Sequence, residues 1–106
     1  MPNLTQTAAA PSWTFLTNHS HVLICIATDP EARMRDIADR VGITERAVQR
    51  IVEDLTEGGY LEIEKHGRRN TYAVKARKHL RHPVEAHVLV EKLLGIVLEV
   101  PAAKKK

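Results

Sequence analysis

Three hydrogen-bonding side chains in the middle of the chain recur at helical spacing. Arg46, Gln49 and Arg50 stand at positions i, i+3 and i+4, which places them on one face of a helix. An arginine guanidinium can donate two hydrogen bonds to O6 and N7 of guanine, and a glutamine amide can bond N6 and N7 of adenine. These residue types therefore favour recognition of base edges in a major groove. A solvated face, in which the arginines pair with carboxylates such as Glu45 and Asp54, is the other interpretation.

A strongly basic segment follows these residues. Residues 65–81 hold seven Lys or Arg side chains and no carboxylate, whereas residues 1–64 hold five basic and ten acidic side chains. The helix around Arg50 is net acidic, so attraction to phosphate groups must come from the basic segment, through release of counterions. Charge alone is equally consistent with a solvated basic loop. The basic residues are Lys65, Arg68, Arg69, Lys75, Arg77, Lys78 and Arg81.

Three helices are expected to position these side chains. The first is predicted over residues 17–28, where Asp29-Pro30 stops it. The second is predicted from Met34 to Val41, because Gly42 reaches a positive φ without steric cost. The third is capped by Thr44 and runs to about Glu57. We expect the aromatic residues before the first helix to mark the start of the packed fold; they and their apolar neighbour are Trp13, Phe15 and Leu16.

The apolar periodicity then changes from helical to alternating. Residues 60–64 and 71–74 are predicted as paired strands, with Leu61 and Ile63 on the inner face and residues 66–70 as the turn. A last helix is predicted from Pro83 to Val100, with an apolar face wide enough to pack against a second chain as well as its own domain. A helix that only covers its own core is the alternative. The residues predicted at the dimer contact are Val90, Leu93, Leu94 and Val97.

The second and third helices have the spacing of a helix-turn-helix. Ala38 is small where the two helices cross, Gly42 makes the turn four residues later, and Val48 is buried six residues beyond that. Apolar residues fill the other inward positions. This arrangement allows two helices to approach closely at a steep angle, so that the second can enter a major groove.

In its order of elements the chain resembles the winged-helix transcription regulators, particularly the small MarR and ArsR type, over residues 13–98. The resemblance rests on three segments: DIADRVGIT from Asp36 to Thr44, VQRIVEDL from Val48 to Leu55, and Gly59-Tyr60-Leu61. It implies a mainly α fold with a small β-hairpin, in which a three-helix core carries a wing and a C-terminal dimerisation helix. The third helix would enter the major groove of double-stranded DNA, and the wing would touch the backbone or the minor groove.

The resemblance also assigns the DNA-contacting residues. MarR-type wings usually carry an Asp-Arg pair, whereas here Gly67 precedes Arg68. The residues that it places on the groove-facing side of the third helix are Thr44, Glu45, Arg46, Gln49 and Arg50. In the wing, the predicted DNA contacts are Lys65, Arg68 and Arg69.

Three alternatives remain at this point. A winged-helix protein–protein adaptor would use the same fold with a different surface. An ArsR-like metal sensor would use the histidine-rich segment His79–His87, but Pro83 interrupts its helical phase and the spacing does not match a zinc motif, so no metal site is predicted. Redox sensing would need Cys25, which is expected to be a small buried apolar residue. No motif of an enzyme or a cofactor stands out, and nothing indicates a small-molecule effector.

Length and composition limit the chain to one compact domain. It has 106 residues, of which 43% are hydrophobic and 27% charged, an ordinary globular balance. A single cysteine excludes an internal disulfide, and no apolar run approaches the roughly 18 residues that cross a bilayer. We expect a cytoplasmic homodimer with no membrane contact. Its predicted parts are a flexible arm (1–12), the winged helix-turn-helix domain (13–82), the dimerisation helix (83–100) and a basic tail (101–106).

Overall fold

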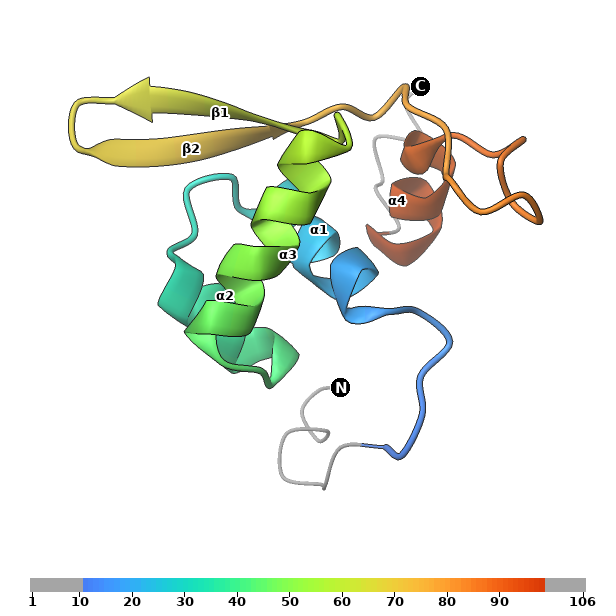
Figure 1. The fold of residues 1–106 in the computed structure, drawn as a ribbon, viewed down its shortest axis with the longest axis horizontal. Coiled ribbons are helices and arrows are strands. Elements are labelled where there is room, and N and C mark those ends of the chain that lie inside the picture. The colour runs from blue at the N-terminus through green and yellow to red at the C-terminus, as the bar shows by residue number, and fades with distance from the viewer. Residues whose placement is uncertain (1–10, 99–106) are drawn as a thin grey trace.

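The computed structural model describes residues 11–98, and the fold is mainly α with one small hairpin (Figure 1). The predicted basic tail, Val100 and most of the predicted N-terminal arm lie outside the described residues. The order of helix, helix, helix, hairpin and helix confirms the predicted winged helix-turn-helix fold. The elements are α1 (Asn18–Thr28), α2 (Met34–Val41), α3 (Glu45–Glu57), β1 (Leu61–His66), β2 (Arg69–Val74) and α4 (Val90–Leu98).

Local capping signals set the ends of the first three helices. The hydroxyl of Thr17 accepts a hydrogen bond from the Ser20 amide at 3.3 Å, and that of Thr44 accepts one from the Ala47 amide at 3.0 Å. Gly42 ends α2 with φ of 86°, a left-handed conformation that a side chain would strain. The predicted bounds of α2 are confirmed, and those of α1 and α3 hold to within one residue.

The core lies where α1, α2 and α3 meet. Ile26, Ile37 and Val48 come from these three helices, and each is at most 1% exposed. Full burial of a side chain of this size contributes about 1.5–3 kcal/mol relative to its exposure. Val90 of α4 and Leu61 at the base of the hairpin complete the core, with 1% and 3% exposure. This packing fixes α3 against α2 and leaves the opposite side of α3 open to solvent.

The hairpin is longer than predicted. The antiparallel strands pair from Leu61–Val74 to His66–Arg69, so the turn contains only Gly67 and Arg68 instead of the predicted residues 66–70. Glycine with φ of 67° at the first turn position permits this tight connection. The inward position predicted for Ile63 is wrong, because this side chain is 45% exposed. The hairpin projects beyond the helices, which cover only its base (Figure 1).

The last helix begins later than predicted. α4 starts at Val90, whereas residues 83–87 form turns and Leu89 forms an isolated β-bridge with His79. The reason is a pairing between distant backbone segments. The Leu80 amide donates to the Val88 carbonyl at 2.9 Å, and the Val90 amide donates to the Lys78 carbonyl at 2.8 Å. These bonds draw the chain back on itself, so residues 79–89 form a closed loop and the helix cannot start at Pro83.

The segment before α1 lies on the surface. Trp13 is 68% exposed and Phe15 is 92% exposed, so the expectation that these aromatic residues mark the start of the packed fold is wrong. Their rings contact each other edge to face, with centroids 5.1 Å apart. The buried face of α1 packs against α2, α3, α4 and β2, which leaves these rings outside the core.

Candidate nucleic-acid interface

The outer face of α3 carries exposed polar side chains. Arg46, Gln49 and Arg50 are exposed, as the helical spacing predicts, because the apolar side of α3 packs into the core. No hydrogen bond or ion pair engages their side chains within residues 11–98. Thr44 and Glu45, at the start of the helix, are exposed as well.

The nearby carboxylates pair with other elements instead of with these arginines. Oε2 of Glu45 lies 3.7 Å from Nε of Arg35 on α2. Oδ2 of Asp54 lies 2.8 Å from Nε2 of His19 on α1. The alternative of an α3 face whose arginines pair with Glu45 and Asp54 is therefore not what the structure contains, and the arginines of α3 can reach an external ligand.

The two arginines of the wing differ in their surroundings. Arg68 lies in the turn and is exposed, and no ion pair holds it in the described part of the chain. Arg69 is the first residue of β2, and its Nη2 donates a hydrogen bond to the Glu31 carbonyl at 3.1 Å. Lys65 is exposed on β1 opposite Asn70. Of the three predicted DNA contacts in the wing, Arg68 and Lys65 therefore have no bond to the helical body, whereas Arg69 has one.

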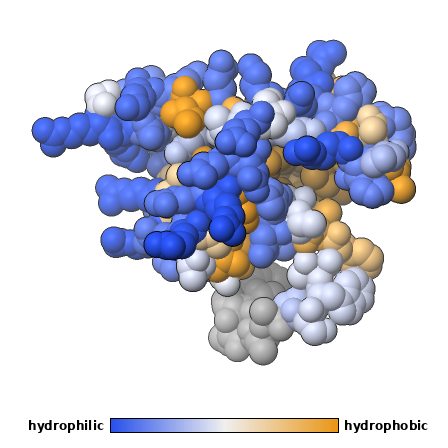
Figure 2. All heavy atoms as spheres, viewed as in Figure 1, coloured by the Kyte–Doolittle hydropathy of each residue, from blue (hydrophilic) through white to orange (hydrophobic). Residues whose placement is uncertain are grey.

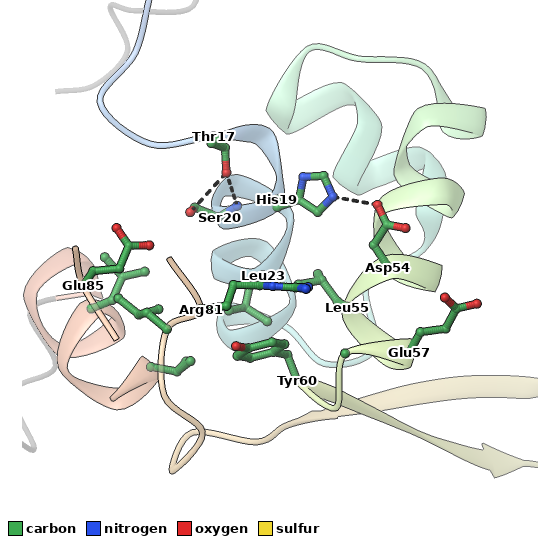
Figure 3. A pocket seen from close by; sticks show the side chains of 14 residues that line it. Thr17, His19, Ser20, Leu23, Asp54, Leu55, Glu57, Tyr60, Arg81 and Glu85 are labelled. Atoms are coloured by element: carbon green, nitrogen blue, oxygen red, sulfur yellow. Dashed lines mark hydrogen bonds and ion pairs between the residues drawn. The ribbon is translucent and has the colours of Figure 1, made fainter. Parts of the chain in front are cut away.

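The basic segment does not form one continuous cationic surface. Nζ of Lys75 lies 3.3 Å from Oε1 of Glu62, and Nζ of Lys78 lies 5.5 Å from the centroid of the Tyr60 ring. Arg81 lies beside α1 and the end of α3 (Figure 3). The basic segment continues past the hairpin toward α4, so only its first part lies in the wing. The expectation that the whole segment attracts phosphate groups is therefore corrected: only the part in the wing lies where it could do so.

The wing and the exposed face of α3 lie on the same side of the molecule. Gln49 of α3, Arg69 and Asn70 of β2, and Arg33 just before α2 line one open cleft of about 500 Å³. Mostly hydrophilic side chains cover α3 and the hairpin in the view of Figure 2, with a small hydrophobic patch over the hairpin. Sequence analysis missed Arg33 and Asn70, because only the packing of the hairpin against the α1–α2 connection brings them beside Gln49.

The predicted dimer contact is only partly on the surface. Val90 and Leu94 are 1% and 9% exposed in the protomer's own core, so they are not available to a second chain. They are buried because α4 packs directly on α1. Leu93 is half-buried, and Val97 is 40% exposed beside Ile96, which is 76% exposed.

A second cavity of about 580 Å³ lies between α1, the end of α3 and the segment that leads into α4 (Figure 3). Its floor is apolar, and its rim holds the His19–Asp54 pair, Arg81 and Glu85. The Arg81 side chain extends across the cavity between Leu55 and Tyr60 in this view. The cavity lies away from the hairpin tip and contributes no residue to the cleft beside Gln49.

The histidine-rich segment and the cysteine have structural surroundings. No group of three His, Cys, Asp or Glu side chains within the described ranges could hold a metal ion. Nδ1 of His79 bonds the Ala86 carbonyl at 2.9 Å, and Nδ1 of His82 accepts a hydrogen bond from the Val84 amide at 3.1 Å. Cys25 is 7% exposed, and burial raises the pKa of its thiol while the charge of Arg40 partly opposes that shift.

Comparison with known proteins supports the winged helix-turn-helix fold. Residues 16–62 match a family model of winged helix-turn-helix DNA-binding domains. No curated protein matches the chain. No helix within residues 11–98 is long and apolar enough to cross a membrane. The matched span covers α1, α2, α3 and the start of β1, and it supports DNA as a binding partner.

Proposed function

We propose that this protein is a transcriptional regulator that binds double-stranded DNA sequence-specifically, of the small MarR or ArsR type. In this proposal α3 enters the major groove, and the hairpin tip contacts the neighbouring backbone or minor groove. The observation that carries the proposal is the shared cleft, which Gln49 of the helix lines together with Arg69 and Asn70 of the wing. In this proposal the protein is cytoplasmic and binds DNA in the same compartment.

The residue roles follow from the exposed chemistry. Arg46, Gln49 and Arg50 have the donors and acceptors that read base edges, and each bidentate pair discriminates by about 1–3 kcal/mol. Thr44 and Glu45 lie at the start of the same helix, where a recognition helix contacts bases. Lys65 and Arg68 supply phosphate contacts, which position the protein on the duplex without reading sequence. Arg69 differs from these two residues, because its Nη2 already donates a hydrogen bond to the Glu31 carbonyl.

We also propose that two copies bind together. The apolar side chains of α4 that remain on the surface continue into a groove lined by Val97, Trp13, Ile24 and Ile43. Covering such side chains in a homodimer would remove them from water. Two-fold symmetry then predicts a pseudo-palindromic DNA site with half-site centres about 34–36 Å apart. A monomeric mass for the full chain at micromolar concentration, measured by sedimentation, would contradict the proposed dimer. It would leave the proposal of DNA binding unaffected.

The test of DNA recognition is selection of bound duplexes from a random pool at two salt concentrations. The parent chain is expected to enrich a symmetric consensus. Arg50→Ala should lose preference at one base pair per half-site, by a factor of about 5–150, which corresponds to about 1–3 kcal/mol. Arg81→Ala removes the same charge away from the interface and should select the parent consensus. Enrichment of no sequence, or the same consensus with Arg50→Ala, contradicts the proposal. Binding of a protein partner that is insensitive to salt would favour an adaptor instead.

A further inference from the structure

The cleft between the wing and α3 includes three polar side chains whose hydrogen-bond donors have no partner among the described residues. Arg33, Gln49 and Asn70 all line it, and none of their side chains makes a hydrogen bond or an ion pair with residues 11–98. Arg33 precedes α2 as its N-cap residue, but its side chain makes no capping bond. The Arg33 guanidinium therefore stabilises no other part of the described residues, and it lies next to the surface proposed to bind DNA.

Arg69 is held in a different way from its neighbours. Its Nη2 donates to the Glu31 carbonyl at 3.1 Å, which joins β2 to the connection between α1 and α2. The Tyr72 amide makes a second link to this connection, donating to the Pro30 carbonyl at 3.3 Å. A two-stranded hairpin is marginally stable by itself, so such links set its direction relative to α3.

These two observations indicate different roles for the arginines of the wing and the cleft: Arg33 is free to bind a ligand, whereas Arg69 is bonded to the protein. We propose that the cleft binds one phosphodiester group of the DNA backbone, with Arg33 and Asn70 as its ligands and Arg69 as the positioning residue that holds the wing wall in place. The inference rests on the proposed function. A strand that passes from the groove entered by α3 to the groove reached by Arg68 must cross the space between these elements, and the cleft lies there.

The chemistry of the lining fits a phosphate better than a base. A guanidinium forms two parallel hydrogen bonds with phosphate oxygens, and an amide adds a further donor. Glu31 is the one acidic residue that lines the cleft, and its charge opposes an anion. The proposal therefore has a gain-of-binding prediction. Glu31→Gln, which keeps the backbone carbonyl that Arg69 uses, should tighten binding of duplex DNA severalfold.

The first experiment measures the affinity of the full chain for the selected duplex at several salt concentrations by fluorescence anisotropy. Each phosphate contact contributes about 0.9 to the slope of log K against log salt. Arg33→Ala should lower this slope by about 1 and weaken specific and unrelated duplexes equally. Arg81→Ala is the matched control, because Arg81 lines the separate cavity between α1 and the end of α3. An unchanged slope with Arg33→Ala overturns the phosphate site.

The second experiment locates the phosphate. Neutral methylphosphonate groups replace single phosphates of the duplex in turn, and one position per half-site should weaken the parent chain severalfold. The same replacement should weaken Arg33→Ala much less than the parent, because the guanidinium contact is already lost and only that of Asn70 remains. If Arg33→Ala responds to every position as the parent does, the cleft is not the phosphate site even though the chain binds DNA. If the parent binds no duplex at all, the proposed function fails instead.

The third experiment tests the positioning role of Arg69 without DNA. Hydrogen exchange of the hairpin amides should be severalfold faster in free Arg69→Ala than in the parent, whereas Arg68→Ala should exchange at the parent rate. Arg69→Lys keeps the charge and a donor, and it should restore part of the protection. Equal exchange rates in Arg69→Ala and Arg68→Ala would overturn the assignment of Arg69 as the residue that holds the wing.

Discussion

Removal of one hydroxyl group at Tyr60 should loosen the joint between α3, the wing and the C-terminal segment. The Tyr60 hydroxyl donates to the His79 carbonyl at 2.6 Å. The backbone of the same residue bonds Leu55 at 2.8 Å and Lys75 at 2.9 Å, so it lies where three parts of the chain meet. Tyr60→Phe keeps the ring, which is 9% exposed, and removes only the hydroxyl.

The size of the effect follows from what the substitution leaves behind. A hydrogen bond of this kind contributes about 0.5–1.5 kcal/mol, and a buried carbonyl left without its donor costs about 1–3 kcal/mol. The His79 carbonyl is only partly buried, so water can replace part of the lost bond. We therefore expect a loss of about 1 kcal/mol in the free energy of unfolding, or a Tm about 4–8 °C lower for a domain of this size.

The assay is thermal and urea unfolding followed by circular dichroism. Tyr72→Phe is the matched control, because the structure gives the Tyr72 hydroxyl no hydrogen-bond partner among the described residues, although this side chain is 8% exposed. The control should change Tm by much less than Tyr60→Phe does. Equal stability of Tyr60→Phe and the parent, or an equal loss in both variants, would refute the argument that the bond to His79 holds this joint.

Two further predictions concern the core. Burial raises the pKa of the Cys25 thiol above its ordinary 9.0, so the native protein should react slowly with iodoacetamide at pH 8 and rapidly in urea. The pKa of the Cys25 thiol is higher in the folded state than in the unfolded state, so its contribution to the free energy of unfolding should be complete below pH 9 and be lost as the pH rises above 9. Cys25→Ala should lose less stability over this pH range, and an equal loss in both proteins would contradict the prediction. Ile37→Ala should cost about 2–5 kcal/mol in urea unfolding because its side chain is 1% exposed, whereas Val84→Ala, at 77% exposure, should cost less than about 1 kcal/mol. Similar losses for both variants would contradict the position of the core.

The helix-turn-helix could be predicted from sequence because its signals are local. Thr44 caps α3 through a bond to an amide three residues later, and Gly42 ends α2 through its own backbone conformation. The apolar stripes of these helices also fix which face of α3 is exposed. That is why Arg46, Gln49 and Arg50 were correctly placed on the outer side before any contact was known.

The errors arose where distant segments decide the conformation. Pro83 is a favourable first residue of a helix, but pairing of Leu80 with Val88 keeps its segment in turns. Trp13 has a side chain typical of a core, yet the face of α1 that could bury it is already covered by other helices. The cleft residues Arg33 and Asn70 are far apart in sequence, and only the packing of the wing places them together.

The central claim is that the outer face of α3 and the wing form one DNA-binding surface. The most direct measurement is a map of backbone amide chemical shifts in the full chain, recorded while the selected duplex is added. We expect the largest changes in residues 44–50 and 65–70, with smaller ones at Arg33. Changes centred on the apolar groove beside α4, or on the cavity of Figure 3, would contradict it.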